Sequence, residues 1–158
     1  VLEDRHDILL SEMNVKLPEM RAFDGAWTAF RTRLDAKVDR KEFIVGCPTL
    51  KVAGRVDILL LVCLKGELQR SLFDWKTGKF ERENRFQRLL APFDDLQDCE
   101  LVKYSLQLSM YRLLMERMEI YHDLGDSYLV HLKRDGTFFI HRAIDFRERL
   151  FLWFEDRP

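Results

Sequence analysis

Charged residues that could do chemistry stand within an apolar stretch from Gly54 to Gly78. Lys65-Gly66 separates its two apolar runs, and glycine supplies the positive φ that a tight hairpin turn requires. If these two residues form the loop of a β-hairpin, Asp57 stands directly opposite Asp74, with Cβ atoms about 5 Å apart. Strand alternation puts Lys76 on the same face as Asp74. The sequence therefore predicts three charged groups on one face of a hairpin.

Two facing carboxylates in an apolar sheet repel each other and are costly to desolvate, so they need a counter-charge. A divalent cation would supply it, and oxygen ligands without thiolates suit Mg²⁺ or Mn²⁺ better than zinc. A lysine beside such a site can orient a water molecule or neutralise charge on a phosphate. The alternative interpretation is an exposed edge pair, Asp74 and Lys76, with Asp57 facing water at a strand end. The apolar flanks favour the metal site.

Three motifs occur in chain order on elements that suit their roles. They are Gly54-Arg55-Val56-Asp57, Asp74-Trp75-Lys76-Thr77-Gly78 and Gln107-Leu108-Ser109-Met110-Tyr111. These motifs resemble the G-x-x-D, (D/E)-x-K and Q-x-x-x-Y motifs of the PD-(D/E)XK nuclease superfamily, in its RecB-like exonuclease branch. The resemblance covers roughly residues 6–145 and is greatest to stand-alone nucleases of phages and large DNA viruses.

The resemblance implies a metal site and assigns roles to particular residues. Mg²⁺ or Mn²⁺ would be held by Asp57, Asp74, the backbone carbonyl of Trp75, and His6 on a first helix. Lys76 would position the attacking water. Gln107 and Tyr111 would lie beside the hairpin and hold Lys76 or the DNA backbone.

Two positions bear on how closely this chain follows the family pattern. Related nucleases often carry a glutamate four residues after the histidine of the first helix, where this chain has Leu10. Glu42 stands where related nucleases often have an acidic residue near the sheet edge, and whether it reaches the metal is left open.

The activity that the resemblance implies is metal-dependent hydrolysis of DNA phosphodiester bonds by an exonuclease. DNA would be the partner, together with a larger replication or repair assembly. Two alternatives stay open: a weakly active or inactive DNA-binding or assembly module of the same fold, and a nuclease that acts on RNA, since the metal chemistry does not depend on the sugar.

Composition places the chain among ordinary globular proteins. Its 158 residues suit one domain spanning 1–158, and 47% hydrophobic with 34% charged residues is a typical balance. No apolar run reaches the roughly 20 residues of a membrane span, and no signal peptide opens the chain. We therefore expect a soluble, intracellular protein without a membrane partner. The chain opens without methionine and is already helix-like, as a chain lacking its first residues would be.

Three cysteines, Cys47, Cys63 and Cys99, are widely separated. Without a C-x-x-C pair, they indicate neither a disulfide framework nor a zinc ribbon. We expect them to be small buried residues. Some RecB-like nucleases hold an iron–sulfur cluster with four cysteines, so no iron–sulfur cluster is expected here.

The net charge of −1 gives no general sign of a nucleic-acid partner, so local charge decides. Residues 79–88 carry a surplus of positive charge, with Phe80 and Phe86 interleaved as in surfaces that bind phosphates and stack bases. The predicted nucleic-acid-binding residues are Lys79, Arg82, Arg85, Arg88 and Lys103. A solvated helix face with internal ion pairs is the alternative interpretation of residues 79–88.

The elements that position these residues are predicted from periodicity and turn signals. A helix opens at Pro18 with an apolar stripe of Trp27, Phe30, Leu34 and Val38. Strands are expected at 42–45, 50–64, 68–75, 128–132 and 138–142, the last two joined around Asp135-Gly136. A loop over 91–100 leads into a helix that runs through Met118 or beyond, and residues 146–153 form a final helical or ragged segment. The fold class is thus α/β: a small mixed sheet flanked by helices, with a restriction-endonuclease-like core.

Overall fold

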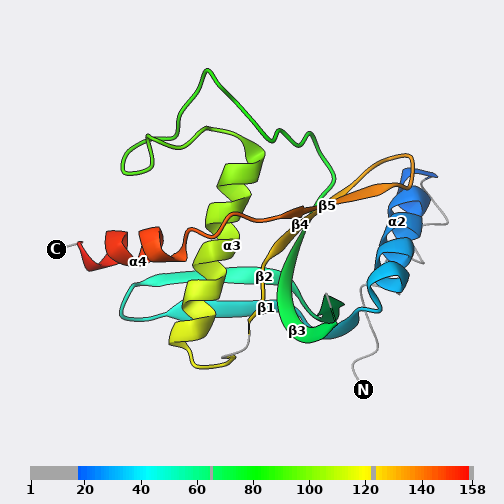
Figure 1. Ribbon diagram of the computed structural model, residues 1–158, viewed down its shortest axis with the longest axis horizontal. Helices are drawn as coiled ribbons and strands as arrows, with labels where there is room; N and C mark the ends of the chain where they lie inside the picture. Colours follow the sequence, from blue (N-terminus) through cyan, green and yellow to red (C-terminus); the bar gives the residue numbers. More distant parts are fainter. Residues whose placement is uncertain (1–17, 65, 122–123, 157–158) are drawn as a thin grey trace.

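The computed structural model describes residues 18–64, 66–121 and 124–156, and it has a mixed α/β fold (Figure 1). His6 and the predicted first helix lie outside these residues. The described elements, in chain order, are α2 (Pro18–Leu34), β1 (Lys37–Cys47), β2 (Val52–Leu64), β3 (Glu67–Lys76), α3 (Glu100–Arg117), β4 (Tyr128–Leu132), β5 (Phe138–Arg142) and α4 (Arg147–Glu155).

One five-stranded sheet has the strand order β1-β2-β3-β4-β5. In this sheet β3 and β4 pair in parallel, and the connection between them passes through α3. The β2–β3 register runs from Ile58 opposite Phe73 to Leu64 opposite Glu67. This register confirms the predicted hairpin, in which Gly66 adopts a positive φ of 83°. The second predicted hairpin, β4–β5, is confirmed with the predicted strand bounds.

Each face of the sheet buries its own apolar core. On one face α2 covers the strands, and Phe30 packs edge-on against Phe73 and Trp75 at centroid distances of 5.4 and 5.2 Å. On the other face, Leu59 and Leu72 of the sheet pack in a cluster with Leu108, Leu114 and Met115 of α3. Figure 1 shows α3 lying across β1 and β2. The β2–β3 hairpin is therefore enclosed between two helical layers.

Two buried serines fix α3 to the segment that joins β5 to α4. Ser105 Oγ accepts a hydrogen bond from the backbone N–H of Ile144 at 3.0 Å, and Ser109 Oγ accepts one from Phe146 at 2.9 Å. Ser109 Oγ also donates to the carbonyl of Ile144 at 3.2 Å. Because a buried backbone group without a partner costs about 1–3 kcal/mol, these bonds specify where α3 lies along the sheet.

Three local predictions differ from the structure. The helix predicted to open at Pro18 ends at Leu34, because Asp35 adopts a left-handed φ of 45°, and Val38 lies in β1 instead of continuing the helical stripe. Cys63 is exposed near the end of β2, whereas Cys99 is buried as expected and Cys47 is half-buried. Residues 79–88 contain no helix, so the alternative of a solvated helix face there is wrong.

The described helices include none that is both long and apolar enough to cross a membrane.

A charged network ties the middle of α3 to the start of α4. The buried guanidinium of Arg112 donates to the carbonyl of Leu124 at 3.3 Å and lies 3.6 Å from a carboxylate oxygen of Asp145. Arg147 donates to the same carboxylate at 3.0 Å and pairs with Glu116. The hydrogen bond from the Arg147 side chain, above all, lowers the pKa of Asp145 to about 2.

We expect Asp145→Asn to lower the free energy of unfolding by about 1 kcal/mol near neutral pH, because buried Arg112 loses its ionised partner and solvent screens the half-exposed carboxylate. The pKa of Asp145 lies below its unfolded value of about 3.9, so this stabilisation is present above about pH 4 and is lost as the pH falls toward 2. Urea denaturation across this range measures the difference from the parent, which should shrink with falling pH. Glu67→Gln, at an exposed position, is the control. A difference independent of pH would contradict the role of the ionised carboxylate.

Candidate active site

The site forms where the β2–β3 hydrogen-bonded ladder ends. Val56 and Leu59 both pack in the cluster beneath α3, although they are three residues apart, so the alternation of β2 is interrupted at Asp57. The ladder ends with the pair Ile58–Phe73, and beyond it the backbone N–H of Trp75 donates to Asp57 Oδ2 at 3.4 Å. A side-chain carboxylate therefore takes the place that a backbone carbonyl would have had in a continued ladder.

Asp74 is a buried carboxylate with only 3% of its surface exposed. Its pKa is raised to about 6, chiefly by burial and then by a hydrogen bond shared with Asp57, while Lys76 acts in the opposite direction. Lys76 Nζ lies 2.6 Å from Asp74 Oδ2 in an ion pair. The structure thus brings Asp57, Asp74 and Lys76 together as the hairpin register predicts.

The oxygen atoms at this point fit a hard divalent cation. In a strand, the N–H and C=O of one residue point toward the same neighbouring strand, so the carbonyl of Trp75 faces the side on which Asp57 binds its N–H. Two carboxylates and a carbonyl are ligand types that Mg²⁺ and Mn²⁺ accept. Within the described residues, no group of three or more His, Cys, Asp or Glu side chains is arranged to hold a metal. The fourth predicted ligand, His6, lies outside the described residues.

Residues of α3 close the site above the sheet. Lys76 Nζ lies 3.8 Å from the ring centroid of Tyr104, so the residue of α3 that holds the lysine is Tyr104. Gln107 Nε2 donates to Tyr111 Oη at 2.7 Å. Gln107 and Tyr111 do lie one and two turns along α3 from Tyr104, but their polar groups bind each other.

At Gly54, α3 lies too close to β2 for the strand to carry a side chain. A Cβ atom at this position would lie 2.4 Å from Cε1 of Tyr111, well inside van der Waals contact. Gly54 therefore allows the tyrosine ring to rest directly on β2, three residues before Asp57. The first and third motifs, far apart in the sequence, meet through this contact.

The predicted basic segment lies in a long loop, residues 77–99, between β3 and α3. Figure 1 shows this loop, in green, arching over the first turn of α3. Several of its predicted nucleic-acid-binding residues have acidic partners: Lys79 pairs with Glu81, and Arg85 lies 3.5 Å from Glu83. Lys103, at the start of α3, likewise lies 3.0 Å from Asp98. Their positive charge is partly compensated within the protein.

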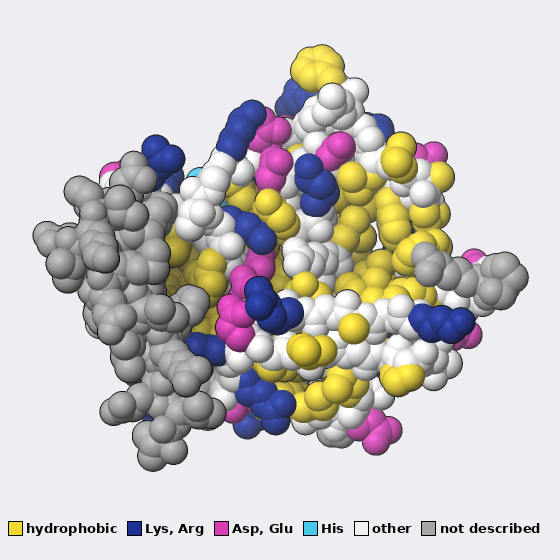
Figure 2. Space-filling view, turned by 180° about the vertical axis from the view of Figure 1, so that it is seen from behind, with side chains coloured by type: hydrophobic (Ala, Val, Ile, Leu, Met, Phe, Trp, Pro, Cys, Tyr) yellow, Lys and Arg dark blue, Asp and Glu magenta, His cyan; other side chains and the backbone are white. Residues whose placement is uncertain are grey.

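Arg82 and Arg88 differ from the other basic residues of this loop. Arg88 donates to the carbonyl of Asp95 at 3.2 Å, and its charge contributes to lowering the pKa of the Asp95 carboxyl, for which the hydrogen bond from Arg149 is the largest cause. Arg82 is exposed, and within the described residues no acidic side chain forms a salt bridge with it. On the face shown in Figure 2, basic and acidic side chains are interspersed in a band across the middle.

Asn84 holds the loop in shape. Its Oδ1 accepts hydrogen bonds from the backbone N–H groups of Phe86 and Gln87, at 3.1 and 3.2 Å, and its Nδ2 donates to the carbonyl of Asp98 at 3.0 Å. Its backbone N–H donates to Gln97 Oε1 at 2.9 Å. The two limbs of the loop are thereby joined near the end that enters α3.

Glu42 lies at the edge strand β1 with a positive φ of 47°. Its carboxylate lies 3.2 Å from Arg55 Nη1, and both side chains are largely exposed. Arg55 precedes Asp57 by two residues, so Glu42 belongs to the surroundings of the site through this pair.

Sequence reasoning assigned Phe80 to a base-stacking surface but gave no role to Tyr104, His131 or His141, which adjoin Lys76 or Phe80. The helical spacing of Tyr104 from Gln107 is a signal that could have indicated a shared face. For His131 the signal is strand alternation with Leu129 in the predicted strand. The position of Phe80 follows from the path of the loop, for which the sequence holds no periodic signal.

No protein-family model matches the chain, and no curated protein is significantly similar to it. Inference about function therefore depends on the three motifs and on the chemistry of the site.

In the metal-free protein, we expect Asp74→Asn to raise the free energy of unfolding by on the order of 2 kcal/mol above about pH 6. The pKa of Asp74 is raised in the folded protein, so ionisation there costs stability above pH 6, and the cost disappears as the pH falls toward 4. Asparagine resembles the protonated form and avoids this cost.

Thermal unfolding without metal measures this stabilisation. The same measurement with Mg²⁺ or Mn²⁺ tests whether Asp74 helps to bind the metal. The metal should raise the melting temperature of the parent and of the exposed control Asp94→Asn, but not that of Asp74→Asn. If Asp74→Asn were less stable than the parent, and neither metal changed the melting temperature of the parent, the carboxylate pair would be structural.

Proposed function

We propose that this protein is a Mg²⁺- or Mn²⁺-dependent deoxyribonuclease of the PD-(D/E)XK type that acts as an exonuclease. One observation carries the proposal: Asp57 and Asp74 meet at the end of the β2–β3 ladder with the ammonium group of Lys76 2.6 Å from Asp74. A buried carboxylate with a raised pKa beside a second carboxylate is unfavourable without a cation, and such arrangements cluster at functional sites.

Asp57, Asp74 and the carbonyl of Trp75 would hold the metal ion. When bound, the cation would supply Lewis-acid stabilisation of phosphate charge and make a bound water more acidic. Cation binding to Asp74 would also offset the cost of ionising a buried carboxylate, since nearby positive charge lowers a carboxyl pKa. The candidate site is thus most stable when it is loaded.

Lys76 is the residue placed to act on the attacking water or on the phosphate. Its ammonium is held between the Asp74 carboxylate and the face of the Tyr104 ring. These two contacts fix the position of a long side chain whose charge would otherwise be free to move, so less conformational entropy is lost in the transition state. A charged lysine cannot ligate the metal, so its role is separate from metal binding.

The proposed substrate is DNA, which would reach the site along the loop of residues 77–99. Arg82 and Arg88 offer positive charge there, and among the described residues neither forms a salt bridge with an acidic side chain, whereas Lys79 and Arg85 do. Because part of the positive charge of the loop is compensated within the protein, we expect modest affinity for DNA. We also expect a shallow slope of log affinity against log salt, since each neutralised phosphate on duplex DNA contributes about 0.9 to that slope.

Incubation of labelled linear and circular DNA with Mg²⁺, Mn²⁺ or EDTA tests the proposal directly. We expect metal-dependent loss of linear DNA from its ends and no cleavage of circular DNA. Cleavage of circular DNA would contradict exonuclease action, and the absence of cleavage with either metal would overturn the proposed activity. RNA substrates in the same experiment test sugar preference.

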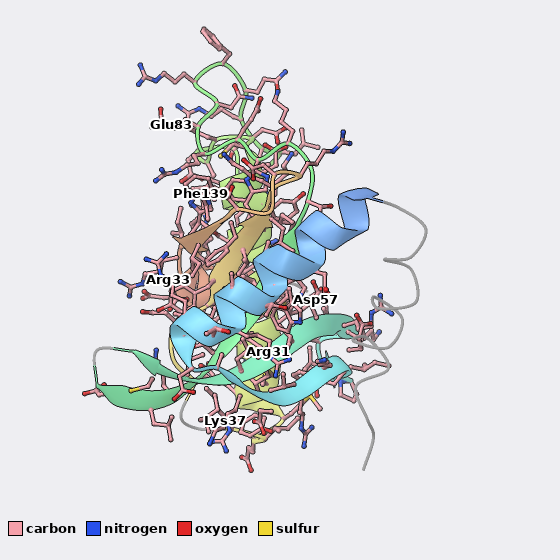
Figure 3. All side chains as sticks on the ribbon, turned by 90° about the vertical axis from the view of Figure 1, so that its right-hand side faces the viewer. Arg31, Arg33, Lys37, Asp57, Glu83 and Phe139 are labelled. Carbon is pink, nitrogen blue, oxygen red and sulfur yellow. The ribbon has the colours of Figure 1, made fainter. Side chains whose placement is uncertain are left out.

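We expect Lys76→Ala to reduce turnover by about 10²–10³-fold, a usual loss when a group that stabilises transition-state charge is removed. Metal-induced thermal stabilisation should be retained, because the oxygen ligands remain. Lys37→Ala, an exposed lysine at the start of β1 labelled in Figure 3, is the matched control. Equal loss of metal binding in Lys76→Ala and Asp74→Asn would contradict the division of roles.

We expect Tyr104→Leu to lower turnover about tenfold with little change in KM, because the cation–π contact that orients Lys76 is lost. Tyr104→Phe should restore turnover, since the ring remains. Tyr121→Leu removes a tyrosine with its own cation–π partners, Arg40 and Arg70, and serves as the control. If Tyr104→Phe were as impaired as Tyr104→Leu, the hydroxyl and not the ring would be the important group.

A further inference from the structure

A row of aromatic rings extends from the candidate site across the sheet. Tyr104 contacts the Lys76 ammonium, and its ring is nearly parallel to that of Phe80, with centroids 6.2 Å apart. Phe80 stacks on His141 at 4.7 Å with an interplanar angle of 10°. Beyond it, Phe139 lies 6.5 Å from His141 at 25°. We call these four residues the aromatic row.

The register of the sheet explains why these rings share a face. Lys76 is the partner of His131 in the parallel β3–β4 pair, and His131 is opposite Phe139 in the β4–β5 pair. Directly paired residues project to the same face, so the row lies on the face that carries Lys76. His131 stacks on Phe80 at 5.5 Å and its Nε2 lies 2.8 Å from the carbonyl of Gly78, which fixes the loop beneath the rings.

Positive charge lies close to the aromatic row. Lys133 Nζ lies 4.4 Å from the centroid of Phe139. Arg82 is close enough to His141 to lower the pKa of that imidazole, although desolvation is the larger cause. A lowered pKa leaves the His141 ring uncharged at neutral pH, which suits stacking.

Phe139 is the accessible end of the row. It is 49% exposed on the edge strand β5, whereas Phe80, His131 and His141 are half-buried. In Figure 3, Phe139 lies below the loop that carries Glu83 and above the region of Asp57. The Phe139 ring is therefore accessible to solvent at the edge of the sheet.

From this geometry, and resting on the proposed nuclease function, we propose that the aromatic row binds unpaired nucleobases of a DNA strand whose phosphodiester backbone enters the site at Lys76. Aromatic rings interleaved with cations are the arrangement by which proteins bind single strands without reading their sequence. Bases stack on the exposed ring of Phe139, while Lys133 and Arg82 lie near the adjoining phosphates. The site would then require an unpaired stretch next to the bond that is cleaved.

The alternative is a purely structural role for these rings, because Phe80 packs against β4 and β5 and so attaches the loop to the sheet. The two roles differ in what happens when the bases are removed from the ligand. Stacking on bases disappears with an abasic strand, whereas a structural defect of the loop weakens binding of every strand equally.

Fluorescence anisotropy in EDTA, with a labelled single-stranded oligodeoxynucleotide and the same oligonucleotide made abasic at its central positions, tests the proposal. Phe139→Ala should weaken binding of the normal strand by about 5- to 150-fold, the range for losing one base–aromatic stack. Binding of the abasic strand should be the same for the parent and for Phe139→Ala. The matched control is Phe151→Ala, which removes an exposed phenylalanine of α4 that lies under Arg117 at 5.2 Å.

An unchanged affinity of Phe139→Ala for the normal strand would overturn the proposal, as would an equal loss on normal and abasic strands. His141→Leu replaces the ring by an aliphatic side chain, and it should weaken binding of the normal strand but not of the abasic strand. An equal loss of affinity for the two strands would contradict the role of the aromatic row. An RNA strand of the same sequence shows whether the sugar matters.

This experiment contains no divalent metal, so its outcome is independent of cleavage. Base-dependent binding by a parent that cleaves nothing would overturn the nuclease function and leave the row as a binding site. Metal-dependent cleavage by a parent whose affinity is insensitive to Phe139→Ala would overturn the row alone.

Discussion

The burial of Asp74 constrains the whole centre of this molecule. A carboxylate that is almost completely enclosed must have partners, and the structure provides Lys76 on one side and Asp57 on the other. Asp57 can approach only because the ladder between β2 and β3 stops at Ile58–Phe73. The same interruption gives the backbone of Trp75 a side-chain acceptor instead of a strand neighbour. Regular pairing between β2 and β3 thus ends at the place where Asp57, Asp74 and Lys76 come together.

The position of α3 follows from this constraint and completes it. A helix over the charged end of the hairpin must bring groups that tolerate an ammonium, and Tyr104 does so with its ring. Ser105 and Ser109, on the side of the helix toward the 143–146 segment, fix its position along the sheet. Because the serines are buried and their bonds are directional, α3 has little freedom to slide. The lysine is oriented by a helix that is itself anchored elsewhere.

Local signals sufficed for the parts of the fold that depend on neighbours in sequence. The glycines at 66 and 136 mark both hairpins, and the first fixes the register that brings Asp57 to Asp74. The contact of Tyr104 with Lys76 depends on the rotation of α3 over the sheet, which no local pattern encodes. The loop of residues 77–99 is shaped by single side chains such as Asn84, so its path could not be predicted. At Val38 a local pattern gave a wrong prediction. Its spacing fits the apolar stripe of the helix, but Asp35 ends the helix before this position.

The contact between Gly54 and Tyr111 sets the distance between β2 and α3 near Asp57. The strand contributes no side chain there and the helix contributes a large one, so the two positions together fill one fixed volume. A larger residue at 54 would have to be matched by a smaller one at 111, or else the helix would lift and carry Tyr104 away from the lysine. Among descendants of this sequence, the sizes of these two residues should therefore change in opposite directions, as a coupled pair separated by more than fifty positions of chain.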